Sequence, residues 1–140
     1  MAKLLIVDDD IRLRKLVRTY GEVEHYECDE AADGLAALEK LQNDNFDLVI
    51  LDVMMPGLDG FETLERIRKI SEIPVIMLTA RNEEYDKLTG FGLGVDDYVS
   101  KPFSPKELMA RVGAVLKRNG KKKSVLFYQY KELEIHPDSR

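Results

Sequence analysis

The stretch Leu4-Leu5-Ile6-Val7-Asp8-Asp9-Asp10 places four apolar residues directly before three carboxylates. An apolar block without polar alternation is typical of a parallel strand that is covered on both faces. Residues 48–51 (LVIL) and 75–78 (VIML) are blocks of the same kind, and weaker strands are predicted at residues 26–28 and 97–99. The sequence therefore predicts five parallel strands.

Segments with a helical spacing of apolar residues lie between these blocks. Such stripes run through Leu16, Leu38, Leu64 and Val112, and one more helix is predicted over residues 83–91. Asp10 is expected to cap the first helix. Right-handed crossovers between the strands then give a doubly wound α/β fold, with a five-stranded parallel sheet in the flavodoxin-like order 2-1-3-4-5 and five helices on its two faces.

The composition excludes several classes of protein. The chain has 140 residues, of which 44% are hydrophobic and 34% charged, and this argues against a disordered chain. No apolar run approaches the ~18 residues of a membrane span, so no membrane partner is expected. Cys28 is the only cysteine, which excludes an internal disulfide and a Cys-rich zinc site and favours a cytoplasmic location.

Charge divides the chain into two parts. The net charge of the whole chain is −5, and residues 121–140 carry +2. The first 120 residues therefore carry −7. Residues 117–123 read KRNGKKK, which combines a helix-stop signal with the composition of a solvated linker. We therefore predict a main domain over residues 1–118, a basic linker over residues 119–124 and a β-like tail, with short strands at residues 125–128 and 133–135.

Polar residues follow the predicted strands at their carboxyl ends, where ligands bind to sheets of this kind. Asp8 and Asp9 follow the first strand, and Asp52, Thr79 and Lys101 follow the last three strands. Each of these residues alone would be an ordinary cap, strand-end hydroxyl or solvated lysine. Together they predict a cluster of carboxylates whose charge is costly unless a cation offsets it or a proton is retained. A hard divalent cation such as Mg²⁺ meets that need.

Three longer motifs give a resemblance to a known family. They are the run LDVMMPGLDG, which contains Asp52, the run IMLTA, which ends in Thr79-Ala80, and the run GVDDYVSKPF, which contains Tyr98 and Lys101. With the aspartates after the first strand, they resemble the receiver domain of two-component response regulators over residues 3–118. The resemblance implies that Asp52 is a nucleophile that accepts a phosphoryl group from a phosphohistidine of a sensor histidine kinase.

The same resemblance implies a metal site. Mg²⁺ (or Mn²⁺) would be bound by Asp9, Asp52 and the backbone carbonyl of Met54, and by Asp8 through water. The metal would offset charge on the transferred phosphoryl group. A protein of this kind is a regulatory phosphoacceptor rather than an enzyme, and it catalyses only its own phosphorylation and dephosphorylation.

The resemblance also implies a switch. Lys101 and the Thr79 hydroxyl would contact the phosphoryl oxygens, and Tyr98 would turn into the space that Thr79 leaves. Lys101-Pro102 is expected to be a cis peptide. These movements would change the face formed by the helix over residues 83–91, the strand over residues 97–99 and the helix from Ser104.

The segment over residues 86–118 resembles OmpR/PhoB-type transcription factors, whose receivers form homodimers through this face. The implied interface contains Lys87 with Glu107, Asp97 with Arg111, and Asp96 with Arg118, around Leu88, Phe91 and Ala110. Residues 125–140 would then be the first part of a winged-helix DNA-binding domain in a truncated regulator. Promoter DNA and RNA polymerase would be partners of the full-length protein only.

Three alternatives are weighed against this interpretation. A Mg²⁺-dependent aspartyl phosphohydrolase of the haloacid-dehalogenase type needs an acid/base Asp two residues after its nucleophile, where this chain has Met54. A flavodoxin-like cofactor binder needs a phosphate-binding loop after the first strand, and Asp8 and Asp9 would repel the phosphate of FMN. A single-domain receiver that acts by phosphorelay or protein contact is disfavoured by the segment that resembles OmpR/PhoB-type factors and by the β-like tail.

Overall fold

The computed structural model describes residues 1–80 and 92–135. Five parallel strands form one sheet in the order β2-β1-β3-β4-β5, which confirms the predicted fold class and strand order. The strands are β1 (Lys3–Val7), β2 (Glu27–Ala31), β3 (Leu48–Asp52), β4 (Val75–Thr79) and β5 (Asp97–Ser100). The helices in the described part are α1 (Ile11–Val23), α2 (Gly34–Asn43), α3 (Gly60–Ile70) and α5 (Pro105–Ile135). The helix predicted over residues 83–91 lies outside the described residues.

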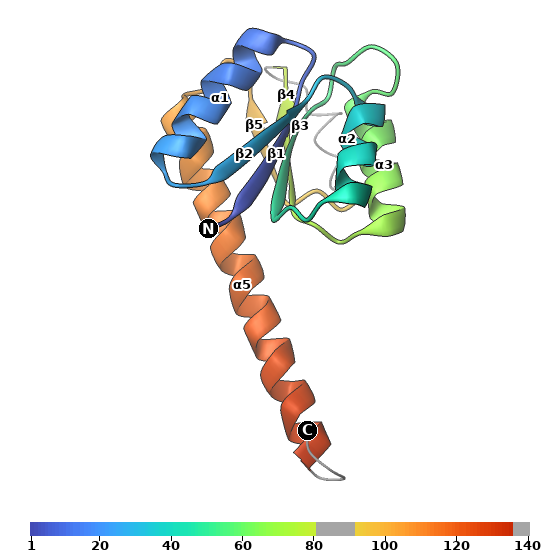
Figure 1. The fold of residues 1–140 in the computed structure, drawn as a ribbon, viewed down its shortest axis with the longest axis vertical. Coiled ribbons are helices and arrows are strands. Elements are labelled where there is room, and N and C mark those ends of the chain that lie inside the picture. Colours follow the sequence, from blue (N-terminus) through green and yellow to red (C-terminus); the bar gives the residue numbers. More distant parts are fainter. Residues whose placement is uncertain (81–91, 136–140) are drawn as a thin grey trace.

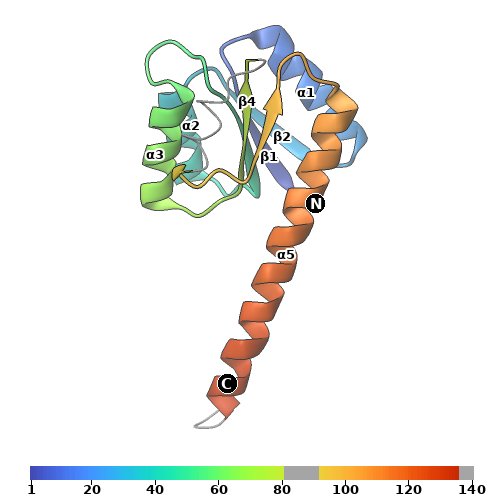
Figure 2. The same cartoon turned by 180° about the vertical axis from the view of Figure 1, so that it is seen from behind.

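The helices cover the sheet on both sides. Helices α1 and α5 lie against one face and α2 and α3 against the other (Figure 1), and the view from behind shows the same arrangement (Figure 2). None of the helices in the described part is both long and apolar enough to cross a membrane.

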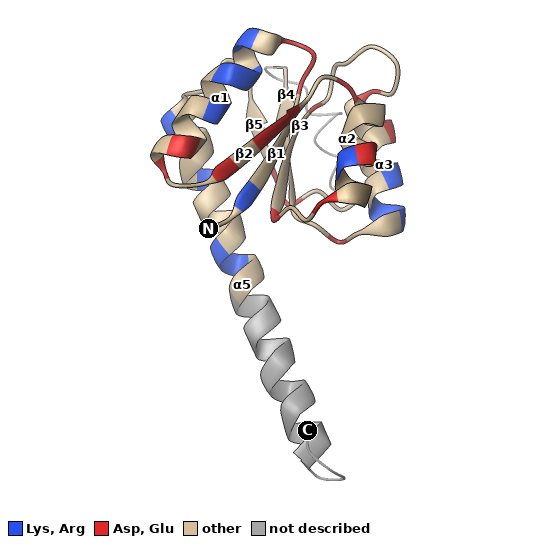
Figure 3. Ribbon diagram, viewed as in Figure 1, with Lys and Arg blue, Asp and Glu red and all other residues tan. Residues whose placement is uncertain are grey.

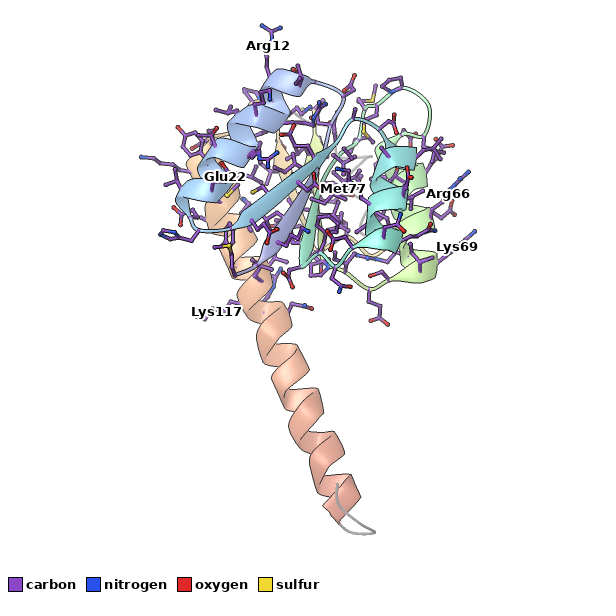
Figure 4. All side chains as sticks on the ribbon, in the orientation of Figure 1. Arg12, Glu22, Arg66, Lys69, Met77 and Lys117 are labelled. Carbon is purple, nitrogen blue, oxygen red and sulfur yellow. The ribbon has the colours of Figure 1, made fainter. Side chains whose placement is uncertain are left out.

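Side chains of the three central strands alternate between two apolar clusters. Leu5, Leu51 and Met77 pack toward α2 and α3, whereas Leu4 and Ile50 pack toward α1 and α5. Met77 is 0% exposed, and it lies in the middle of the molecule (Figure 4). Because burial of one such side chain contributes roughly 1.5–3 kcal/mol, these strands form a rigid base for the residues at their ends.

The parallel register brings the carboxyl ends of the strands to one edge of the sheet. Val7 pairs with both Ala31 and Leu51, and Asp52 pairs with Leu78, one residue before Thr79. Helix α1 begins directly after this edge, because the Asp10 side chain accepts hydrogen bonds from the backbone N–H groups of residues 12 and 13. The predicted cap is confirmed.

Helix α5 corrects the prediction for the tail. It runs from Pro105 to Ile135 through Asn119-Gly120, so the strands predicted at residues 125–128 and 133–135 are wrong. A strand needs a neighbour for its backbone hydrogen bonds, and no segment of the described chain pairs with these residues, whereas a helix satisfies its own bonds. One glycine costs only about 1 kcal/mol in a helix interior, which is too little to end it. Figures 1 and 2 show α5 extending well beyond the sheet. The assignment of residues 125–140 to a DNA-binding domain stays a prediction.

The first residue of α3 packs against the strand that carries Asp52. A Cβ atom on Gly60 would lie 2.4 Å from the carbonyl oxygen of Asp52 and 2.6 Å from the Cα of Val53. Both atoms belong to the backbone and cannot move aside like a flexible side chain. We therefore expect Gly60→Ala to lower the free energy of unfolding by about 2 kcal/mol or more, measured by denaturant titration.

Gly113 is the matched control for this substitution. It lies inside α5, and a Cβ atom there would meet the Tyr26 hydroxyl at an ordinary 3.6 Å. Gly113→Ala should raise the free energy of unfolding by roughly 0.5–1 kcal/mol through helix propensity. Equal effects of the two substitutions would contradict the close approach at Gly60.

Candidate functional site

The predicted carboxylates meet at the carboxyl edge of the sheet. Asp52 is the last residue of β3, and Asp8 and Asp9 follow β1. One carboxylate oxygen from each of the three lies within 4.8 Å of the others. Asp8 and Asp52 are 1% and 3% exposed, whereas Asp9 is exposed. Three hard oxygen donors at this separation fit a divalent cation such as Mg²⁺.

Lys101 joins this group from the end of β5. Its Nζ lies 3.0 Å from Asp52 Oδ1 and 3.5 Å from Asp8 Oδ2. Its backbone N–H donates to the Thr79 carbonyl at 2.7 Å, and the Lys101-Pro102 peptide is cis, as predicted. Lys101 thus contacts the two buried carboxylates, and the exposed Asp9 lies beside them.

Burial raises the pKa of both inner aspartates. The pKa of Asp8 rises from 3.8 to about 6, chiefly through desolvation, with the neighbouring charge on Asp52 acting in the same direction. Burial also raises the pKa of Asp52, although Lys101 and the Met54 backbone N–H oppose the shift. Burial lowers the pKa of Lys101, but the hydrogen bonds and attraction to Asp52 and Asp8 together raise it above its ordinary value. Both shifts of the aspartates express the cost of gathering negative charge in a region of low dielectric.

Thr79 ends β4 at the same edge and has an unsatisfied hydroxyl. The residue is 1% exposed, and among the described side chains its Oγ1 is the buried polar atom without a hydrogen-bond partner. An unsatisfied buried hydroxyl costs roughly 1–3 kcal/mol. A ligand with acceptor oxygens at this edge would remove that cost.

Two further residues that the resemblance assigns to the site, Tyr98 and Met54, differ in how far their side chains are exposed. Tyr98, on β5, is 7% exposed and packs in the apolar cluster on the α2 and α3 side of the sheet. Met54, two residues after Asp52, is 71% exposed beside the pocket. The role of the Met54 carbonyl as a metal ligand stays a prediction.

Residues predicted to pair across a dimer bind partners within the chain. Arg111 Nη1 lies 3.1 Å from Asp97 Oδ2, and Arg111 Nη2 lies 3.4 Å from Glu107 one helical turn away. Ala110 is exposed next to them. The other predicted members of this patch, Lys87, Leu88 and Phe91, lie outside the described residues. Pairing across subunits stays a prediction.

Asp96 is likewise engaged inside the chain. Its Oδ2 accepts a hydrogen bond from the Val75 backbone N–H at 2.8 Å and lies 3.5 Å from Arg68 Nη2. Arg118 donates to the backbone carbonyl of Asp96 at 3.4 Å rather than to its carboxylate. A cross-subunit pair between Asp96 and Arg118 would have to compete with these bonds.

One residue that contacts the loop of the site, Arg14, was not predicted from the sequence. Arg14 Nη1 donates to the backbone carbonyl of Asp8 at 2.7 Å, and Arg14 Nε lies 2.9 Å from Glu30 Oε1. A partial signal exists in the sequence, because Arg14 stands four residues after the helix cap Asp10 and Glu30 stands on the neighbouring strand. The hydrogen bond to the Asp8 carbonyl cannot be predicted from residue types, because every residue has a backbone carbonyl.

Comparison with known proteins gives concordant results. Residues 4–113 match the family model described as the response regulator receiver domain. The chain is 53% identical over 119 residues to a transcriptional regulatory protein CpxR homolog of Haemophilus influenzae, covering 85% of this chain and 52% of the relative. It is 50% identical over 116 residues to the transcriptional regulatory protein ResD of Bacillus subtilis, covering 83% and 48%. The chain therefore spans about half the length of these relatives.

Solved structures include close neighbours of this fold. The receiver domain of Francisella response regulator 1452 superposes with a TM-score of 0.80 at 38% identity, covering 85% of this chain and 99% of that one. The similarity thus extends over nearly the whole of a receiver domain.

The raised pKa of Asp8 predicts a pH-dependent cost to stability. Folded protein binds the Asp8 proton more tightly than the unfolded chain does, because the pKa of Asp8 is raised from 3.8 to about 6. The contribution of Asp8 to the free energy of unfolding is therefore highest below pH 3.8 and falls as the pH rises through about 6. We expect Asp8→Asn to raise the free energy of unfolding by about 3 kcal/mol well above that pH in EDTA, since one pKa unit corresponds to about 1.4 kcal/mol. The gain should shrink toward zero at pH 4.

Urea titrations across this pH range measure the effect. Asp10→Asn is the matched control, because it makes the same chemical change at an exposed helix cap where Asn caps as well as Asp. It should not reproduce the gain in the free energy of unfolding that Asp8→Asn shows well above pH 6. A gain for Asp8→Asn that is independent of pH would contradict the assignment.

Proposed function

The chain belongs to the response regulator receiver domain family, and from this premise we propose that it accepts a phosphoryl group on Asp52 in the cytoplasm from a phosphohistidine of a sensor kinase. The observation that carries the proposal is the contact of Lys101 with Asp52 at 3.0 Å, in a pocket shared with Asp8 and Asp9. This arrangement holds the acceptor, a cation and further hard ligands together before any donor arrives.

Asp52 acts as the nucleophile. One of its carboxylate oxygens bonds to phosphorus while the bond from phosphorus to the donor imidazole breaks, and the electron pair leaves with that nitrogen. The product is an acyl phosphate. Asp52 needs no general base when it is ionised, and its contact with Lys101 favours the ionised form.

The remaining residues bind and orient the transferred group. Asp8, Asp9 and Asp52, with the Met54 carbonyl, would hold Mg²⁺, which when bound offsets negative charge on the phosphoryl oxygens. Lys101 exchanges its contacts with the carboxylates for a phosphoryl oxygen. The Thr79 hydroxyl, buried without a partner, donates to another of these oxygens.

The phosphoryl group regulates the domain by its charge. It brings about −1.5 to −2 charge and three acceptor oxygens to the edge where Thr79 and Lys101 lie. A movement of Thr79 toward the group alters the packing around Tyr98 on the neighbouring strand. We assign the response to the face formed by β5 and the first turns of α5, through which two phosphorylated receivers associate.

The longer protein would be a transcription regulator. Two relatives, which this chain covers over about half of their length, are named transcriptional regulatory proteins. Phosphorylation would then control DNA binding by bringing two subunits together. Receiver-only action by phosphorelay is the runner-up, and it predicts phosphoryl transfer without dimerisation.

Phosphorylation of Asp52 is tested by intact mass after incubation with acetyl phosphate and Mg²⁺. The wild type should gain the mass of one phosphoryl group, and Asp52→Asn should gain none. Asp47 is an exposed aspartate directly before the start of the same strand, and Asp47→Asn should behave as the wild type. Equal uptake by wild type and Asp52→Asn would sink the assignment.

Dimerisation is tested by light scattering on phosphorylated protein. The wild type should shift from monomer to dimer, whereas Ala110→Glu should gain phosphoryl mass yet stay monomeric, because it places a charge in the apolar patch of the interface. Gln42→Glu adds the same charge at an exposed position of α2 and should dimerise normally. A phosphorylated wild type that remains monomeric at all concentrations would favour the receiver-only alternative.

A further inference from the structure

We propose that Arg14 is a positioning residue for the metal-binding loop over residues 8–10, and that Glu30 holds it in place. The inference rests on the proposed function, because it assumes that the pocket binds Mg²⁺. It concerns residues outside the acidic pocket. The contact that carries it is the hydrogen bond from Arg14 Nη1 to the Asp8 carbonyl at 2.7 Å.

This carbonyl controls the orientation of Asp9. The carbonyl of Asp8 and the nitrogen of Asp9 belong to one planar peptide unit, so fixing the direction of the C=O fixes the plane from which Asp9 begins. On the other side of that unit, the Asp8 N–H donates to the Ala31 carbonyl at 3.2 Å. The Asp8 carboxylate also accepts a hydrogen bond from the Asp10 N–H at 2.9 Å.

Asp9 depends on this backbone support. It is exposed, and within residues 1–80 and 92–120 no hydrogen bond or ion pair holds its carboxylate. Its side chain can therefore be aimed at the pocket only through its own backbone. Metal ligands whose supporting contacts are removed typically lose 10–100-fold in metal affinity, so loss of the Arg14 bond should weaken Mg²⁺ binding.

Glu30 fixes the guanidinium that makes this bond. Arg14 Nε lies 2.9 Å from Glu30 Oε1, and the two side chains are 12% and 16% exposed. Arg18 contacts the other oxygen of Glu30 at 3.0 Å. Although burial raises the pKa of Glu30, the two arginines lower it below its ordinary value, so this carboxylate stays charged. The pairing joins α1 to β2, and the ribbon of α1 carries cationic positions (blue) beside the acidic positions (red) of β2 (Figure 3).

Only an arginine serves both contacts well. Its planar fork can donate from Nε to a carboxylate and from Nη1 to a second acceptor, whereas a lysine ammonium is a single point. Arg18 uses the same carboxylate and makes no contact with the Asp8 carbonyl. It therefore separates the effect of the ion pair on stability from the effect of the carbonyl bond on metal binding.

The experiment is calorimetric titration of the full chain with Mg²⁺, in the absence of any phosphodonor. Arg14→Met should raise the Mg²⁺ dissociation constant about tenfold, while Arg18→Met and Arg12→Met should stay within about twofold of the wild type. Arg12 is the exposed control on the same helix and points away from the fold (Figure 4). Hydrogen exchange in EDTA gives a second readout, in which Arg14→Met, unlike Arg18→Met, should speed exchange at the amides of residues 9 and 10.

The outcomes separate the two proposals. If the wild type shows no saturable Mg²⁺ binding, the proposed function fails, and this inference fails with it. If the wild type binds Mg²⁺ and Arg14→Met binds equally well, or Arg18→Met weakens binding as much, the inference alone is overturned. If Arg14→Met does not fold, Glu30→Gln decides: it keeps Arg14 but loosens its anchor, and an unchanged dissociation constant would overturn the proposal.

Discussion

Asp8, Asp9 and Asp52 repel one another, because the sheet holds their carboxylates together at one edge. Asp8 and Asp52 are almost fully buried, and burial raises the pKa of each. Lys101 offsets part of the charge at 3.0 Å and 3.5 Å. A cluster of this kind favours a cation that reaches it, which is the property that the proposed Mg²⁺ site would use.

The apolar interior is what makes this arrangement possible. The core residues of β1, β3 and β4 are fully buried between two helical layers, so the strand ends cannot separate to relieve the repulsion. Gly60 adds to this rigidity, because its lack of a side chain lets α3 approach the backbone of Asp52 and Val53. Packing in the sheet thus stabilises the fold, whereas the carboxylates at its edge destabilise it. This agrees with the general finding that functional sites lower the stability of a fold.

Much of this could be predicted from the sequence, and the reasons for the successes and failures differ. The apolar blocks specify strands because residues 48–51 are buried on both faces, and the strand ends then follow from parallel register. The prediction of strands in the tail was wrong. Residues 125–135 include types that favour strands, but a strand needs a neighbouring strand for its hydrogen bonds, whereas helix α5 makes its own. The bond from Arg14 to the Asp8 carbonyl could not be predicted, since a backbone acceptor has no residue type. The partners of Asp96 and Asp97 within the chain could not be predicted either. A charged side chain can pair with a residue of its own chain or with one across an interface, and the sequence does not distinguish the two.

Those intramolecular pairs bear on how the receiver could change its state of association. Arg111 already binds Asp97, and Asp96 already binds the Val75 N–H. An interface built from the same groups exchanges existing bonds for new ones, so the net gain per pair is small, as expected for exposed ion pairs. Association would then depend on apolar contact at residues such as Ala110 and on the position of the elements that carry the charges. In the proposed switch, a phosphoryl group acting through Thr79 and Tyr98 would need to shift those elements only slightly, because an equilibrium between nearly balanced sets of bonds responds to a small bias.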